Sequence, residues 1–221
     1  MNMHNFFKFL EDKANKPIPI RYKLIHDIDS ITERDLKVRG DLDLSNTRIT
    51  SLPEGLNVKG SLYLHNTPIS SLPEGLKVKG NLYLGNTSIT LLPEGLKVEG
   101  SLVLSNTRIT SLPEGLKVGG SLVLSGTRIT SLPEGLEVGG SLVLSITRIT
   151  SLPKGLKVGE ALYLSNTPIT SLPEGLKVKG NLYLGKTSIS KQYKKYGKDA
   201  TTRFIEDLKK KDSNIEGHIY L

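Results

Sequence analysis

The chain has 221 residues, a formal net charge of +8 at pH 7, and a hydrophobic content of 37% without tryptophan. It contains no cysteine, which excludes disulfide bonds, thiolate metal sites and cysteine nucleophiles. The basic residues are spread along the sequence. A charge of this size would favour weak attraction to nucleic acid or anionic membranes, but solubility alone explains it.

Residues 1–39 are expected to form an N-terminal cap. Residues 4–14 have the pattern of a short amphipathic helix, and Pro17 and Pro19 are expected to end it. Residues 20–39 predict a degenerate first coil of the repeat that follows, since Leu36-Lys-Val-Arg-Gly40 resembles a later segment of that repeat.

No targeting or membrane segment is evident in the sequence. The apolar run at Phe6, Phe7 and Phe9 is too short and too charged for a signal-peptide core. No apolar run approaches membrane-spanning length, so a soluble cytoplasmic protein without a membrane partner is expected. Delivery into a host cell by a dedicated secretion machinery would leave no such mark.

From Gly40 to about Ser190, one register recurs every twenty residues. One copy reads Gly100-Ser-Leu-Val-Leu-Ser-Asn-Thr-Arg-Ile-Thr-Ser-Leu-Pro-Glu-Gly-Leu-Lys-Val-Gly119. Eight copies of the first half occur, and seven continue into the Leu-Pro-x-Gly-Leu half. A fixed period of this length predicts that residues 40–190 form a solenoid in which each coil stacks on its neighbour.

Each residue type that recurs has a structural explanation. Two leucines separated by one residue, such as Leu42 and Leu44, are the inward pair of a short strand. Thr47 and its copies offer a hydroxyl to the irregular backbone after the strand; the alternative is that threonine simply favours that backbone conformation. Pro53 and its copies favour an extended opposite wall, and glycines such as Gly55 allow tight corners.

Residues 191–221 are expected to form a C-terminal cap. Residues 199–211 predict a helix with Phe204, Ile205 and Leu208 on one face and lysines in its last turn. Residues 215–221 are able to add a final strand. At both ends, covering the exposed hydrophobic face of the solenoid is the simpler explanation, and partner binding is the alternative.

The pattern Leu102-x-Leu104-x-x-Thr107-x-Ile109-x-x-Leu112-Pro-x-x-Leu resembles a leucine-rich repeat. The Leu-Pro step and short period are similar to the bacterial LPX class of Yop and Ipa effectors, and similar runs occur in phage-encoded proteins. The resemblance implies a mainly β, α/β-type solenoid of about eight repeats, with a parallel concave sheet, an extended convex side and helical caps. The ligase activity of some relatives needs a catalytic cysteine, which this chain lacks.

The residue between the paired leucines points outward, onto the side that the resemblance makes concave. Along the stack these residues are Asp43, Tyr63, Tyr83, Val103, Val123, Val143, Tyr163 and Tyr183. The tyrosines and valines are candidate partner contacts, because exposed contiguous apolar strips are uncommon without a use. The alternative is that these residue types simply favour strands.

Two further features are candidate contacts. Ile146 stands where the other copies have asparagine, glycine or lysine, which either serves a partner or reflects drift. Arg108, Arg128 and Arg148 occupy consecutive copies, with Arg48 further away, and would suit an acidic partner. The copies are nearly identical, so duplication explains the arginine row equally well.

No catalytic triad, metal-ligand set or phosphate-binding loop is present in the sequence, so neither an enzyme nor a cofactor is expected. The favoured function is a non-enzymatic scaffold that binds a partner protein. The resemblance alone implies that this binding would inhibit or redirect a host protein if the chain is borne by a phage or pathogen. The alternatives are a basic nucleic-acid-binding solenoid and a structural, self-assembling subunit. Partner identity and oligomeric state do not follow from the sequence.

Overall fold

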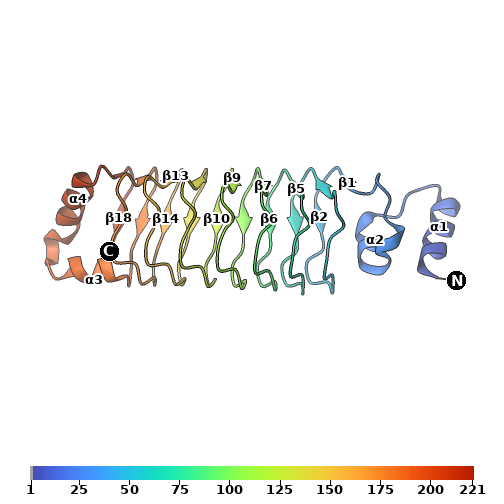
Figure 1. The fold of residues 1–221 in the computed structure, drawn as a ribbon, viewed down its shortest axis with the longest axis horizontal. Coiled ribbons are helices and arrows are strands. Elements are labelled where there is room, and N and C mark those ends of the chain that lie inside the picture. The colour runs from blue at the N-terminus through green and yellow to red at the C-terminus, as the bar shows by residue number, and fades with distance from the viewer. Residues whose placement is uncertain (1) are drawn as a thin grey trace.

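The computed structural model describes residues 2–221, which form an elongated parallel β-solenoid with helices at both ends (Figure 1). Two nine-stranded parallel sheets run along the stack. In the central coils, every strand pairs with the equivalent strand of the next coil, twenty residues away, as in the register Leu122↔Leu142. The predicted solenoid of twenty-residue coils is therefore confirmed.

One sheet, which we call the leucine sheet, holds the Leu-x-Leu segments. Its strands are β2 (Leu42–Asp43), β4 (Leu62–Tyr63), β6 (Leu82–Tyr83), β8 (Leu102–Val103), β10 (Leu122–Val123), β12 (Leu142–Val143), β14 (Leu162–Tyr163), β16 (Leu182–Tyr183) and β18 (Ile219–Tyr220). In each coil the leucine of the strand is buried and the next residue faces outward. The predicted alternation is confirmed.

The other sheet, which we call the lysine sheet, lies in the second half of each coil. Its strands are β1 (Lys37–Val38), β3 (Asn57–Val58), β5 (Lys77–Val78), β7 (Lys97–Val98), β9 (Lys117–Val118), β11 (Glu137–Val138), β13 (Lys157–Val158), β15 (Lys177–Val178) and β17 (Asn214–Ile215). The sequence analysis expected an extended wall here and did not predict a second sheet. Two residues per coil suffice to form it, because identical coils bring identical backbone groups into register.

A continuous aliphatic core fills the space between the two sheets. The six apolar positions expected in each coil are all buried; in one central coil they include Leu122, Leu124 and Ile129, each with 0% of its surface exposed. No coil could bury these side chains alone, so the stability of each coil depends on its neighbours.

The recurring threonine ties the corner after the strand to the strand itself. In all eight copies its hydroxyl donates to the carbonyl of the leucine three residues earlier, as Thr67 does to Leu64 at 2.6 Å. Most of these hydroxyls are buried, where an unpaired polar group would be costly. The predicted hydrogen-bonding role is confirmed.

Two kinds of glycine serve different purposes. Gly55 and its copies adopt positive φ, +75° at Gly55 itself, which side chains disfavour. Gly60 does not, but a Cβ there would lie 2.6 Å from the carbonyl carbon of Gly40. Glu160 occupies the equivalent corner without a positive φ, so the left-handed conformation is not required there.

The N-terminal cap is more helical than predicted. Helix α1 (Met3–Ala14) agrees with the expected helix, and β1 confirms the predicted resemblance of residues 36–40 to a coil. Residues 20–30, however, form helix α2 (Ile20–His26) and the short helix η1 (Ile28–Ser30) instead of a degenerate coil. This segment lacks the Leu-x-Leu pair, and its apolar residues recur at helical spacing, with Leu24 buried against the solenoid.

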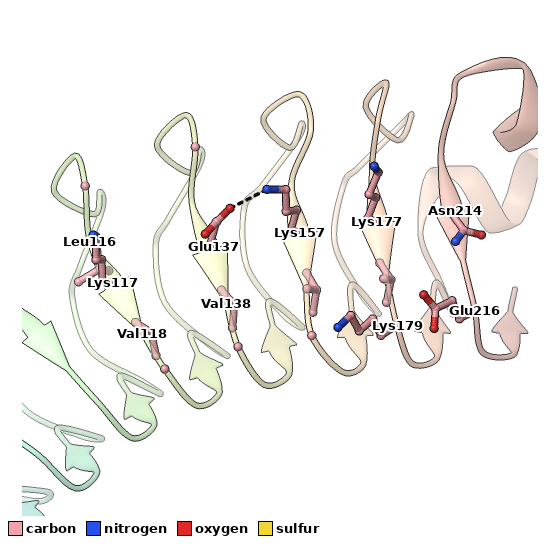
Figure 2. A pocket seen from close by; sticks show the side chains of 17 residues that line it. Leu116, Lys117, Val118, Glu137, Val138, Lys157, Lys177, Lys179, Asn214 and Glu216 are labelled. Carbon is pink, nitrogen blue, oxygen red and sulfur yellow. Dashed lines mark hydrogen bonds and ion pairs between the residues drawn. The ribbon is translucent and has the colours of Figure 1, made fainter.

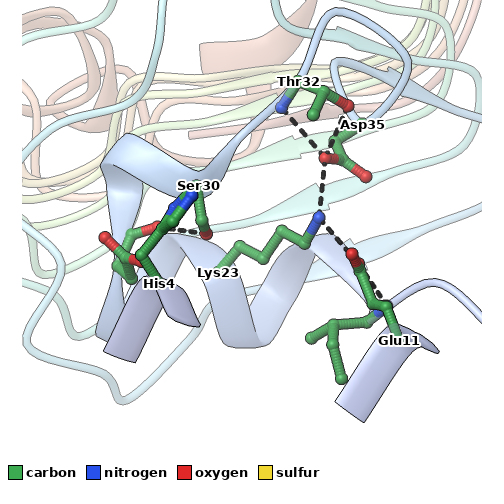
Figure 3. A network of polar contacts seen from close by, with 8 residues as sticks. His4, Glu11, Lys23, Ser30, Thr32 and Asp35 are labelled. Atoms are coloured by element: carbon green, nitrogen blue, oxygen red, sulfur yellow. Dashed lines mark hydrogen bonds and ion pairs between the residues drawn. The ribbon is translucent and has the colours of Figure 1, made fainter. Parts of the chain in front are cut away.

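A buried lysine holds the N-terminal cap together (Figure 3). The Lys23 ammonium lies 2.9 Å from the Glu11 carboxylate of α1 and 3.0 Å from Asp35. Asp35 also accepts hydrogen bonds from the Thr32 N–H and hydroxyl, and Glu11 accepts one from the Ile18 N–H. The network therefore links α1, α2 and the segment that leads into β1.

The C-terminal cap contains α3 (Ser188–Lys194), η2 (Gly197–Asp199) and α4 (Ala200–Lys210). Helix α3 begins three residues before the expected break, because the Thr187 side chain accepts a hydrogen bond from Ser190 N–H and caps it. In α4, Phe204 and Leu208 are buried as predicted, whereas Ile205 is 38% exposed. The chain then returns to both sheets as β17 and β18, which confirms and extends the predicted final strand.

Candidate protein-binding surface

The outward residues of the leucine sheet form one row across its nine strands. The register pairs Asp43 with Tyr63 at one end, Val123 with Val143 in the middle and Tyr183 with Tyr220 at the other end. The tyrosines and valines that the sequence singled out are partly exposed and face away from the core. Neither terminus lies over the middle of this sheet (Figure 1).

The tyrosines of the row stack on one another. Tyr63 and Tyr83 have ring centroids 4.8 Å apart and planes inclined by 9°. Tyr163 and Tyr183 stack at 4.5 Å, and Tyr183 and Tyr220 at 4.7 Å, both with planes inclined by 3°. The stacking fixes the ring orientations and leaves ring edges and hydroxyls, rather than ring faces, directed outward.

The sequence analysis missed Tyr220. Gly217-His-Ile-Tyr-Leu221 repeats the spacing of Gly60-Ser-Leu-Tyr-Leu64, but α3 and α4 separate it from the regular period. A search for the motif without the period could have found it. Tyr220 is 47% exposed and extends the second stack to three rings.

Between the two stacks lies the valine segment, which consists of Val103, Val123 and Val143 on β8, β10 and β12. Tyr83 pairs with Val103 and Tyr163 with Val143, so each stack turns one ring face towards this segment. Four strand spacings of about 4.8 Å place these tyrosines about 19 Å apart. Valine is shorter than tyrosine, so the segment is a low apolar floor between two aromatic walls.

The floor is rigidly held at its edge. The Ser101 hydroxyl accepts a hydrogen bond from the N–H of Ser121, and Ser121 accepts one from Ser141, at 3.0 Å in each case. These bonds link successive coils next to the valines. The serine side chains are therefore occupied in holding the backbone, and the valines are the groups left to contact another molecule.

Two groups on the row have shifted pKa values. Burial raises the pKa of the Tyr163 phenol, and the neighbouring Tyr183 raises it further. Hydrogen bonds from the Ser45 hydroxyl and N–H lower the pKa of the Asp43 carboxyl. At neutral pH the row therefore presents a neutral phenol at Tyr163 and a carboxylate at Asp43, at its N-terminal end.

Ile146 is the most unusual residue near this row. It is 65% exposed and has φ of +60°, a left-handed conformation that is costly for a β-branched side chain. Its equivalents Asn46, Asn66, Asn86 and Asn106 have the same conformation and form an amide ladder, for example Asn66 Nδ2 to Asn46 Oδ1 at 3.0 Å. Gly126 and Ile146 interrupt this ladder on the coils of the valine segment.

The arginine row lies on the same coils. Arg108, Arg128 and Arg148 are exposed, and each follows its valine by five residues. Arg48 is exposed as well, but lies three coils away from Arg108. Within residues 2–221 none of these four guanidinium groups forms an ion pair.

Within the repeats, a further exposed apolar side chain escaped the sequence analysis. Leu91 is 63% exposed where the other coils have serine, on the corner that precedes the Leu-Pro step. It lies outside the coils of the valine segment. It therefore serves as a comparison for Ile146 rather than as part of the same surface.

A hollow of about 630 Å³ lies on the outer side of the lysine sheet (Figure 2). Its floor includes Gly119, Gly139 and Gly159, where other coils have lysine or glutamate. Lysines surround it, and Glu137 pairs with Lys157 at 2.7 Å. This hollow was not predicted, and it faces away from the tyrosine and valine row.

Neither a metal cluster nor a membrane-spanning element is found in the described chain. Across residues 2–221, no three histidine, aspartate or glutamate side chains form a group that could hold a metal ion. None of the helices in this range is long and apolar enough to cross a bilayer.

The fold is similar to that of a solved structure described as a Shigella effector LRR domain. The TM-score is 0.55 and the sequence identity 16%, over 100% of this chain and 98% of that chain. No protein-family model matches the sequence, and no curated protein matches it either. The similarity confirms the predicted leucine-rich repeat fold, whereas the resemblance to phage-encoded proteins stays a prediction.

Proposed function

We propose that the chain is a non-enzymatic scaffold that binds a partner protein on the outer face of the leucine sheet, centred on the valine segment. The observation that carries this proposal is a partly exposed apolar strip that the fold does not require. Asp43 occupies the same strand position in β2, so a polar residue is compatible with the coil. Strand preference alone therefore explains the strip poorly.

The row also has the physical properties of a binding surface. Its backbone is fixed by two sheets and its tyrosines by stacking, so little conformational entropy remains to be lost on binding. Tyrosine walls around an apolar floor match the aromatic anchors and water-excluding surroundings that dominate protein interfaces. Such a surface would inhibit or redirect its partner by occupying it, which is our more specific proposal for a role on a host protein.

A nucleic-acid partner is less well supported. Base stacking requires free ring faces, and the tyrosine faces are largely covered by neighbouring tyrosines. A nucleic-acid complex would also lose affinity steeply as the salt concentration rises. A self-assembling subunit would instead show a mass that grows with protein concentration in light scattering.

The test is affinity purification with mass spectrometry, comparing the wild type with Val123→Glu and with a Tyr83/Val123/Val143/Tyr163 surface variant. We expect one or more proteins to be lost from both variants while thermal unfolding stays within a few degrees. Lys117→Glu, on the lysine sheet, is the matched control and should retain them. Capture that is equal in Val123→Glu and wild type, or lost only with Lys117→Glu, would contradict the proposal.

A further inference from the structure

We infer that the valine segment receives a three-turn amphipathic α-helix with an acidic flank, aligned with the solenoid axis. This inference rests on the proposed function and specifies the kind of partner at the same site. It follows from the hydrogen bonding of the leucine sheet, from the dimensions of the valine segment and from the unpaired arginines on the same three coils.

The backbone of the leucine sheet excludes an extended peptide at this place. Strands β8, β10 and β12 pair with a neighbour on each side, so they offer no free edge for strand addition. An extended peptide over the valines would leave its own N–H and C=O groups against an apolar floor, which is costly. A helix satisfies these groups internally and needs only an apolar stripe.

The dimensions of the valine segment suit a short helix. The Tyr83 and Tyr163 rings stand about 19 Å apart on either side of it. Allowing for ring thickness, about ten helical residues at about 1.5 Å each fit between them, which is about three turns. Along this axis, apolar side chains one turn apart are spaced by about 5.4 Å. They therefore nearly match successive valines at about 4.8 Å.

The arginines define the chemistry of one flank. Arg108, Arg128 and Arg148 stand on the coils of Val103, Val123 and Val143, so their row runs parallel to the valine row. Three adjacent guanidinium groups without counter-charges in the described chain repel one another. A helix with carboxylates at i, i+4 and i+7 would relieve this repulsion, and Arg is well suited to pair with them.

Ile146 completes the apolar side of the surface. In the sequence Ile146 lies between Val143 and Arg148, on the last of the three coils. Its backbone has the left-handed conformation and its side chain is exposed. There it would contact the end of the docked helix. This use offers a reason for a conformation that weakens the fold locally.

The experiment is a selection from a displayed library of three-turn amphipathic helices. The apolar stripe is fixed, and the flanking positions are randomised among Glu, Gln and Lys. Selection uses the wild-type protein, with Val123→Glu as a soluble competitor to remove helices that bind elsewhere. We expect Glu to be enriched on one flank only.

Affinities of the selected helices are then measured against two charge-matched variants. Removing the arginines with Arg108→Gln, Arg128→Gln and Arg148→Gln should weaken binding at least tenfold. Removing three lysines at the same spacing on the other sheet, with Lys77→Gln, Lys97→Gln and Lys117→Gln, should change affinity less than twofold. Circular dichroism establishes that both triple variants remain folded.

Several outcomes would overturn the inference. These are enrichment of Gln or Lys, no helix that depends on Val123, or equal affinity for the two triple variants. If captured proteins still depend on Val123 in the affinity purification, the helical, acidic partner is wrong and the binding face stands. If they do not, the proposed function fails as well.

Discussion

The three central coils, residues 101–160, have the same interior as the coils on either side and a different exterior. Leucine, isoleucine, threonine and valine recur unchanged at the inward positions. Facing outward, valine replaces tyrosine, arginine replaces proline or serine, and glycine replaces lysine or glutamate. Because the core is the same, these differences alter the surface and leave the basis of folding intact.

Duplication of one coil accounts for the likeness of the central coils, but not for their internal differences. Gly126 and Ile146 interrupt an asparagine ladder that runs from Asn46 to Asn106. Isoleucine in a left-handed conformation lowers stability, and its side chain stays 65% exposed. In the central coils, therefore, the residue that stands at the exposed position 146 is not the residue that would make the fold most stable.

The difference between interior and exterior should show most strongly in two neighbouring residues of β10 that point in opposite directions. Leu122→Ala should lower the free energy of unfolding by about 2–5 kcal/mol, because Leu122 is fully buried in a coil that supports both neighbours. Val123→Ala should cost less than about 1 kcal/mol, because Val123 is partly exposed. Urea denaturation measures both, and equal losses would show that Val123 belongs to the core.

A smaller effect of opposite sign is expected at Ile146. Ile146→Asn should raise the free energy of unfolding by about 1 kcal/mol, because asparagine tolerates the left-handed region and its amide would face that of Asn166 on the next coil. The same variant should weaken partner binding. Leu91→Ser, which removes an exposed apolar residue elsewhere, should change neither quantity beyond error. A destabilised Ile146→Asn protein would contradict the assigned strain.

The smallest effect concerns the N-terminal cap and its pH dependence. The Ile18 N–H and Lys23 lower the pKa of the Glu11 carboxyl. Burial opposes, but does not outweigh, the Thr32 and Lys23 hydrogen bonds that lower the pKa of Asp35. Burial lowers the pKa of the Lys23 ammonium, but the Glu11 and Asp35 carboxylates outweigh it, so the pKa is raised.

The direction of these shifts fixes the pH range in which the cap is most stable. Carboxyls with lowered pKa stabilise the cap above their ordinary values of 4.5 and 3.8, and this contribution is lost as pH falls further. The raised pKa of Lys23 gives a contribution that is complete below 10.5 and lost as pH rises beyond it.

The cap should therefore open in acid before the solenoid does. In methyl NMR spectra, the Leu24 signal should broaden as pH falls below the carboxyl range while the Leu122 signal stays sharp. Lys23→Met should reduce this pH dependence. Simultaneous loss of both signals, or no change at Leu24, would show that the Lys23 network does not secure the cap.

The repeat predicted most of the architecture because a fixed period imposes the same environment on every copy. The inward leucines, the threonine hydrogen bond and the outward row all followed from it. Features that depend on contacts between coils did not follow from one copy, such as the second sheet and the tyrosine stacks. Residues outside the period were also missed, since α2 and Tyr220 depend on local or interrupted patterns.

Photo-crosslinking from single positions tests the central claim most directly. A benzophenone amino acid is placed at Val123 on the leucine sheet or at Lys117 beside the hollow of the lysine sheet, and each protein is irradiated in cell extract. The account predicts a specific crosslinked protein from position 123 and none from position 117. Crosslinks from position 117 alone would contradict it and would place the partner on the opposite face.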